Sequence, residues 1–380
     1  MEGAAVDSVP EGNGHEKHSL RSRAATALSS KPVQPAWGLS AGALLAFGLG
    51  FLAARAAGLE EAALGGAITA LFVGIAGLAS PKGLRFKAAG ATALIVFLGL
   101  ILAHLTTGEP IVAGVAMALV MFSAAIVRAA GPVPALLGVL LGAAYFIPAT
   151  IGYTTDISTP NTLLLGLVGI AAGLVTVIVL ARPVDPIELQ PGTSAPTADT
   201  GGDESGTPLQ LIGAAIRGRT PIRAYAFRRG LVIGVAVAVY LATGNHNAFW
   251  IALTIFVVLG PDEASTLEKA LNRSVGTIAG ALLLGALAQF LPTEIVVGIG
   301  VIALVISVAF MLRNYAIYSA GIAMLIVALF GASDQAFIEW AGLRILDTLI
   351  GATIAIASLY LLPSKPGEKP SEQKGEAGAA

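Results

Sequence analysis

The sequence has 380 residues, of which 56% are hydrophobic and 12% are charged, and its formal net charge at pH 7 is -1. A soluble domain is about 45–50% apolar and roughly a quarter charged, so a single soluble core cannot enclose this many apolar residues. We therefore expect an integral membrane protein. The chain contains no cysteine, which excludes disulfides, thiolate catalysis and cysteine-ligated metal.

Apolar runs along the chain predict an all-α polytopic membrane protein with about twelve transmembrane helices, since about 20 helical residues cross the hydrocarbon core. The runs cover residues 37–54, 62–80, 88–106, 110–128, 132–151, 161–181, 228–243, 246–261, 274–291, 295–312, 314–331 and 343–362. Three polar segments have too few apolar residues to form a core. We expect a disordered cytoplasmic tail at 1–35, a cytoplasmic linker at 182–227 and a second disordered cytoplasmic tail at 364–380.

The distribution of Lys and Arg predicts the orientation. If the N-terminus is cytoplasmic, every basic residue except Arg55 and Arg344 falls on the cytoplasmic side of the twelve helices, as the positive-inside rule requires. We therefore expect a multi-pass protein of the cell membrane with both termini in the cytoplasm.

This topology gives a direct prediction. Reporter fusions at Thr200, in the linker, and at Ala380 should both report a cytoplasmic location. A periplasmic signal at either position would contradict the twelve-helix topology.

The two predicted membrane halves, 36–181 and 228–363, align in the same orientation. At an offset of 186, Lys87, Gly90, Gly99 and Thr107 fall on Arg273, Gly276, Gly285 and Thr293. Six helices per half preserve orientation, so the sequence predicts a parallel repeat about an axis along the membrane normal. The N-terminal half is the degenerate copy, because it lacks a counterpart of Arg344 and Asp347.

The ninth predicted helix has two basic residues near its N-terminal, cytoplasmic end. Ser265 and Glu268 have the spacing of a capping box, which predicts a helix that begins just after Pro261 and continues into the membrane. Five residues spaced three or four positions apart lie on one face of this helix: Lys269, Arg273, Gly276, Thr277 and Gly280. Gly276 and Gly280 allow close packing of another helix. The two cations are either lipid anchors or binding groups for an anion.

The twelfth predicted helix carries a second polar stripe made of Arg344, Asp347, Thr348 and Gly351. Residues 348–362 are too few to cross a bilayer, so Asp347 and Arg344 must enter the membrane, where ionisable groups are costly. The two groups are either an ion pair that neutralises itself or a functional site. Asp347 is our candidate for proton coupling, since burial favours its neutral form and Arg344 favours its charged form. Gly351 is a helix-packing position.

The seventh and eighth predicted helices are short, because residues 230–260 are too few for two full crossings. Either Arg228 and Arg229 extend from the cytoplasmic surface, or residues 244–247 lie below the outer surface. His246 is a structural loop residue or a titrating ligand. Trp250 is an interfacial residue or a wall for an aromatic ligand.

Other functional classes have little support. The sequence contains no phosphate-binding loop, no zinc-protease motif and no nucleophile elbow, so we expect neither an enzyme nor a cofactor or metal. Leu209, Leu211, Ile212 and Ile216 beside the basic stretch 217–229 predict a short amphipathic helix on anionic lipid rather than a nucleic-acid site. The expected partners are the bilayer and a small organic anion, and a homo-oligomer is left open.

Several motifs together resemble a known family. They are His246-x-x-x-Trp250-x-x-x-Thr254, Gly260-Pro261-Asp262, Arg273-x-x-Gly276-Thr277-x-x-Gly280, Arg313-Asn314-Tyr315 and Arg344-x-x-Asp347-Thr348-x-x-Gly351. The pattern, over about 228–362, resembles the fusaric acid resistance protein-like (integral membrane bound transporter) domain. That resemblance implies an exporter, with aromatic carboxylic acid efflux proteins as relatives and aluminium-activated malate channels as distant ones.

The sequence therefore favours a proton-coupled exporter of small organic anions, including aromatic carboxylates. On this hypothesis Lys269, Arg273, Thr277, Trp250, His246 and Arg344 bind the substrate. An anion channel and a non-transporting envelope protein are the alternatives. A major facilitator transporter is disfavoured, because residues 81–87 lack the Asp and second Gly of its loop motif.

Overall fold

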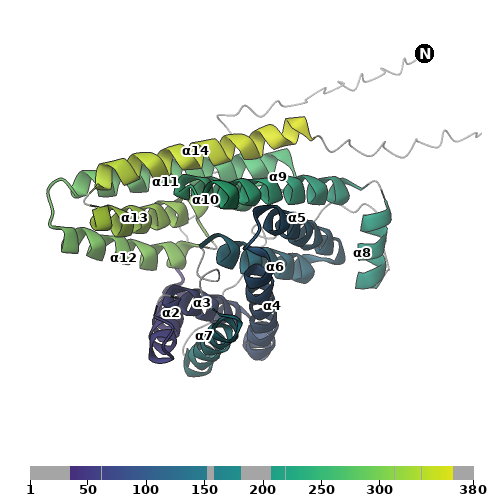
Figure 1. The fold of residues 1–380 in the computed structure, drawn as a ribbon, viewed down its shortest axis with the longest axis horizontal. Coiled ribbons are helices and arrows are strands. Elements are labelled where there is room, and N and C mark those ends of the chain that lie inside the picture. The colour runs from purple at the N-terminus through teal and green to yellow at the C-terminus, as the bar shows by residue number, and fades with distance from the viewer. Residues whose placement is uncertain are drawn as a thin grey trace, which may run out of the picture. The chain divides into compact units, whose positions relative to one another are not determined.

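A computed structural model describes residues 35–60, 62–151, 158–180, 207–218, 220–311, 313–334 and 336–362, and within these ranges all regular structure is helical. The helices that coincide with the apolar runs are α2 (Trp37–Ala56), α3 (Ala63–Ala79), α4 (Arg85–Thr106), α5 (Pro110–Ile126), α6 (Pro132–Ile151), α7 (Thr159–Leu180), α9 (Pro221–Thr243), α10 (His246–Val258), α11 (Glu263–Leu287), α12 (Thr293–Phe310), α13 (Tyr315–Asp334) and α14 (Phe337–Leu361) (Figure 1). The short elements η1 (Lys82–Leu84), η2 (Val127–Ala130) and α8 (Pro208–Arg217) complete the described structure. The predicted all-helical class is confirmed. The predicted tails lie almost wholly outside the described residues.

Nine described segments are long and apolar enough to cross a membrane, and three further apolar helices are shorter, namely Ala63–Ala79, Leu137–Thr150 and Ala248–Val258. Helix α10 has 13 residues, which extend about 20 Å along its axis. That length is less than the roughly 30 Å of a hydrocarbon core. The chain is an integral membrane protein, and α10 is a short helix enclosed by longer ones.

A side chain of helix α9 binds the C-terminal carbonyls of the short helix α10. It begins at Pro221, inside the predicted linker, so Arg228 and Arg229 are buried helical residues rather than extensions from the surface. Arg229 donates hydrogen bonds to the carbonyls of Phe256 (3.0 Å) and Leu259 at the end of α10. The last carbonyls of a helix lack internal partners and carry partial negative charge. Arg229 therefore supplies the donors that the early end of α10 requires.

Helix α11 starts where predicted, directly after Pro261, but with a different cap. The backbone N–H of Ser265 donates to Asp262 Oδ1 (2.8 Å), and the N–H of Asp262 donates to Ser265 Oγ (3.4 Å). The capping box is thus Asp262 with Ser265, and its assignment to Ser265 with Glu268 was wrong. An acidic N-cap is preferred because the carboxylate also complements the helix dipole.

Glycines set the distance between α11 and its neighbour α13, which lie side by side (Figure 1). A Cβ added at Gly276 would collide with the carbonyl of Ala316, and one at Gly280 with the carbonyl of Ala320. A Cβ at Gly351 of α14 would collide with Thr254 and with the carbonyl of Ile251 in α10. The backbones approach closely only because these side chains are absent.

The substitution Gly280→Ala should lower stability by about 1–3 kcal/mol, since the new methyl group has no room beside the α13 backbone. Thermal unfolding in detergent measures the effect. Gly342→Ala is the matched control, because a Cβ at Gly342 of α14 meets no atom within 4 Å. Equal loss in both variants would contradict the role of Gly280 in packing.

Most helix pairings follow the same order in the two parts of the chain, although the packing of α13 on α14 has no comparable counterpart between α6 and α7. In the first, α2 packs on α3 and α7, α3 on α4 and α7, α4 on α6 and α7, and α5 on α6. In the second, α9 packs on α10 and α14, α10 on α11 and α14, α11 on α13 and α14, and α12 on α13. Between the two, α5 packs on α9 and α2 packs on α12.

Candidate functional site: a buried arginine cluster

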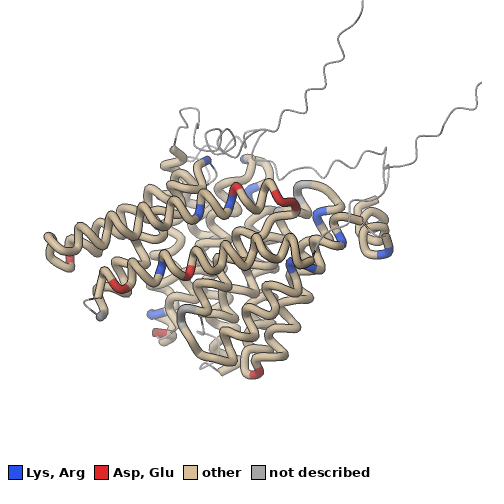
Figure 2. The backbone as a smooth tube through the Cα atoms, turned by 90° about the horizontal axis from the view of Figure 1, so that it is seen from above, with Lys and Arg blue, Asp and Glu red and all other residues tan. Residues whose placement is uncertain are grey.

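Few charged positions interrupt the described helices, as Figure 2 shows. Three that do are almost fully buried: Arg273 is 5% exposed, Arg344 is 1% exposed and Asp347 is 2% exposed. Arg273 comes from α11 and the other two from α14, and α10 and α13 pack against these helices. Ionisable groups buried inside a membrane protein are costly and are usually functional.

Arg273 is held by two neutral hydroxyl groups. Its Nε donates to Thr254 Oγ1 of α10 (3.3 Å), and its Nη1 donates to the Tyr315 hydroxyl of α13 (3.1 Å). Thr254 can accept this bond because its own proton goes to the carbonyl of Trp250 (2.9 Å). These bonds fix the guanidinium between three helices and leave its positive charge without a carboxylate partner among the described residues.

The backbone beneath Arg273 is tied to α13 by two further hydroxyl groups. Ser319 Oγ donates to the carbonyl of Arg273 (3.1 Å) and lies 3.1 Å from Thr277 Oγ1. A serine hydroxyl has one proton, so Thr277 must donate in the second bond. Thr277, a predicted ligand, therefore serves to join α11 to α13 in this structure.

Arg344 lies with its guanidinium carbon 4.1 Å from the centroid of the Trp250 ring. An aromatic face attracts a cation, and Arg in particular stacks on Trp. The Nε and Nη1 atoms of Arg344 are buried and have no hydrogen-bond acceptor in the described structure. Its electrostatic neighbours are Arg273 and Asp347. Two cations thus share a buried site with one carboxylate.

Asp347 and Thr348 contribute unused polar atoms beside Arg344. The Oδ2 atom of Asp347 and the Oγ1 atom of Thr348 are buried and have no hydrogen-bond partner in the described structure. Asp347 and Arg344, one helical turn apart, form no direct ion pair among the described residues. Arg344 stacks on Trp250 and interacts electrostatically with Asp347 without a direct contact between the two side chains.

We refer to Trp250, Thr254, Arg273, Tyr315, Arg344 and Asp347 as the arginine cluster. A buried guanidinium with unsatisfied donors is unfavourable unless an acceptor, preferably an anion, occupies the site. Charge-assisted hydrogen bonds from Arg to a carboxylate are among the strongest in proteins. The cluster therefore has the chemistry of an anion-binding site.

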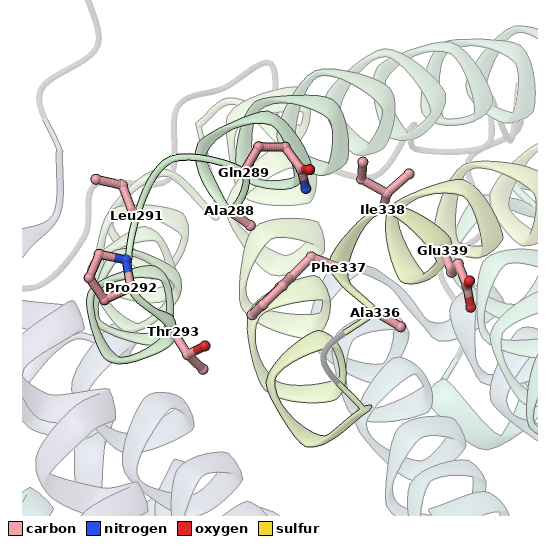
Figure 3. A pocket seen from close by; sticks show the side chains of 9 residues that line it. All are labelled: Ala288, Gln289, Leu291, Pro292, Thr293, Ala336, Phe337, Ile338 and Glu339. Carbon is pink, nitrogen blue, oxygen red and sulfur yellow. The ribbon is translucent and has the colours of Figure 1, made fainter.

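Aromatic residues connect the cluster to the first turns of α14. The Trp250 ring meets Phe330 edge-on with centroids 6.0 Å apart, and Phe330 lies 4.8 Å from Trp340. Next to Trp340, a pocket of about 520 Å³ opens between the α11–α12 connection and the start of α14 (Figure 3). Its lining contains no Lys or Arg, and its one ionisable side chain is the acidic residue Glu339. The cationic donors that an anion would require therefore lie in the arginine cluster and not in the lining of this pocket.

The remaining predicted ligands lie elsewhere. Lys269 is exposed, and its electrostatic neighbours include Arg229 and Arg128 rather than Arg273. His246 is the first residue of α10, and its side chain lies outside the described structure. Tyr315 and Ser319 were not among the predicted ligands. Both contact Arg273 across more than 40 residues. Tyr315 was signalled by the motif Arg313-Asn314-Tyr315, and Ser319 only by its position near the start of an apolar helix.

This arrangement defines a polytopic α-helical membrane protein with a buried cationic cluster. Residues 218–358 match the family described as fusaric acid resistance protein-like. The resemblance inferred from the motifs is thereby confirmed. The matched segment contains every residue of the arginine cluster.

Curated relatives match over a similar length. The inner membrane protein YccS of Escherichia coli (strain K12) is 33% identical over 141 residues, or 37% of this chain and 20% of that protein. The uncharacterized membrane protein YvaC of Bacillus subtilis (strain 168) is 28% identical over 150 residues, or 38% of this chain and 24% of that protein. The chain thus aligns with about a fifth to a quarter of these relatives' lengths. No solved structure matches the chain.

Proposed function

We propose that the protein is a transporter that exports small organic anions, aromatic carboxylates included, in a proton-coupled reaction at the arginine cluster. The observation that carries the proposal is Arg344, which is buried on the Trp250 ring with two donor atoms lacking an acceptor. A carboxylate bound there would accept from these donors and balance the charge that Arg273 and Arg344 leave uncompensated. Trp250 and Phe330 would provide an apolar wall for an attached ring.

The proton enters the proposal through Asp347. An anion held by Arg344 and a charged Asp347 would repel each other in a site of low dielectric constant. Protonation of Asp347 and binding of the anion therefore favour each other. In this scheme the anion and the proton cross the membrane together, so export proceeds when the outward gradient of the anion exceeds the inward gradient of protons.

We also propose that the chain makes twelve crossings as two parallel six-helix repeats. The pairings that recur in the same order within 36–181 and 228–363 support the repeat. The contacts between the two parts also support it. In a twofold repeat α9 would correspond to α2 and α12 to α5, so a contact of α5 with α9 requires an equivalent contact of α12 with α2. Both contacts are present.

Uptake of labelled phthalate into proteoliposomes, with and without an alkaline lumen, tests the proposed activity. We expect protein-dependent uptake that a pH gradient converts into accumulation, since proton and anion move together. Flux that a pH gradient leaves unchanged would indicate a channel. Uptake no greater than in protein-free vesicles under the same gradient would contradict transport of this class of anion.

A further inference from the structure

Helix α8 is amphipathic and precedes a candidate membrane helix. The Thr207 hydroxyl accepts from the N–H of Gln210, the Gln210 side chain accepts from the N–H of Thr207 (2.9 Å), and Pro208 occupies the first turn. These features fix the start of the helix independently of the rest of the chain. The candidate span Pro221–Thr243 begins four residues after α8 ends at Arg217, so α8 must lie near the membrane boundary.

One part of the apolar face of α8 packs on the protein and the other does not. Ile212 and Ala215 join an apolar cluster with Ala125, Ile126 and Tyr225. Leu209 and Ile216, which lie about 20° apart on the helix circumference, are 82% and 46% exposed. Apolar side chains of this size placed side by side near a membrane boundary are typical of a helix that lies in the lipid interface.

Arginines border this exposed apolar strip. Arg217 Nε donates to the carbonyl of Gly213 (3.2 Å), and Arg223 Nη1 donates to the carbonyl of Gly218 (3.3 Å). Neither arginine has an ion-pair partner among the described residues. Arg128 belongs to η2, against which α8 packs. The exposed guanidinium groups thus stand beside an apolar strip, and within the described part of the chain no acidic side chain pairs with them.

The neighbouring surface of α9 is apolar as well. Phe227, which follows Arg223 by one turn, is 57% exposed. A lipid acyl chain is the apolar partner expected along a membrane helix, and a lipid phosphate is the anionic partner expected at its cytoplasmic end. An acyl chain can thus pack on Leu209, Ile216 and Phe227, and a lipid phosphate can accept from Arg217 and Arg223.

We propose that α8 is an interfacial helix that binds anionic phospholipid, with Leu209 and Ile216 among the acyl chains and Arg217 and Arg223 on lipid phosphates. This site is separate from the arginine cluster and does not depend on the transport activity. It would fix the position of the linker that joins the two membrane halves. The lipid headgroup, rather than free phosphate, is the expected ligand because the apolar strip lies beside the cations.

Spin labels test the placement of α8, and the lack of cysteine makes each site unique. Leu209→Cys and Ile216→Cys carry the label on the apolar strip, and Ala214→Cys carries it on the exposed opposite side of the helix. In nanodiscs of phosphatidylcholine and phosphatidylglycerol, labels at 209 and 216 should be more accessible to oxygen than to a water-soluble nickel complex. The label at 214 should show the reverse. Equal nickel accessibility at all three positions would overturn the proposal.

The charge requirement is tested with the double variant Arg217→Gln, Arg223→Gln. Native mass spectrometry should show retention of phosphatidylglycerol over phosphatidylcholine by the wild type and a loss of this preference in the variant. Arg55→Gln is the control, since Arg55 is an exposed cation already 3.8 Å from Glu60. Inorganic phosphate should not displace the lipid. Displacement by phosphate, or an unchanged lipid preference in the double variant, would contradict binding of an anionic lipid by α8.

Discussion

Replacing Arg344 with Gln should reduce the rate of phthalate uptake into proteoliposomes at least about tenfold. A hydrogen bond to a charged group contributes about 1.5–3 kcal/mol, and 1.4 kcal/mol corresponds to a factor of ten in affinity. Glutamine keeps an amide donor but removes the positive charge that a carboxylate would balance. The loss should appear at substrate concentrations below saturation, because the variant weakens binding of the anion.

Stability separates this role from a structural one. Arg344 is a buried cation with two unpaired donors, and removing such a charge does not destabilise a protein in the way that breaking a buried ion pair does. We therefore expect Arg344→Gln to unfold at the same temperature as the wild type or a higher one. Arg344→Lys keeps the charge but not the planar stacking on Trp250, so its uptake should be intermediate. A parallel loss of stability and uptake in Arg344→Gln would show that Arg344 only holds the fold.

The helices could be predicted from the sequence because a membrane leaves few alternatives. A chain in lipid must satisfy its backbone hydrogen bonds within each segment, so a long apolar run indicates a helix before any tertiary contact is known. The burial of Asp347 followed from the same reasoning, since residues 348–362 are too few to cross a bilayer alone. The predicted shortness held for α10, with 13 residues, but not for α9, which begins inside the predicted linker and has 23 residues.

The contacts of the cluster could not be predicted in this way. Lys269 and Arg273 share one helical face by spacing, yet Lys269 is exposed and Arg273 is buried. The difference depends on Thr254 and Tyr315, which reach Arg273 from other helices. Spacing within one helix carries no information about which part of its face a neighbour covers. The glycines indicated close approach, but not that the neighbour of Gly276 is Ala316.

The role of Arg229 illustrates the same limit for helix ends. The sequence indicated that two arginines precede a short pair of helices, and it left open whether they extend from the surface or residues 244–247 lie below it. In the structure Arg229 binds the carbonyl of Leu259, 30 residues away, at the end of α10. A cap that comes from another helix has no local pattern, because only the fold brings donor and carbonyl together.

Asp347→Asn should abolish the accumulation of phthalate that a pH gradient drives, and it should leave exchange of phthalate across the membrane intact. Asparagine has nearly the shape of a protonated Asp and cannot ionise. Its neutral amide does not repel an anion at Arg344, so the binding site remains usable at every pH. Coupling is lost because no proton is bound or released when the anion binds.

Thr348→Val is the matched control for this experiment. Thr348 is the neighbour of Asp347 on α14, and its buried hydroxyl also lacks a partner, but it cannot titrate in the physiological range. If proton coupling requires the Asp347 carboxylate, Thr348→Val should retain gradient-driven accumulation while Asp347→Asn loses it. Accumulation that persists in Asp347→Asn would exclude this carboxylate as the coupling group. The buried acid would then serve only to moderate the charge of Arg344 and Arg273.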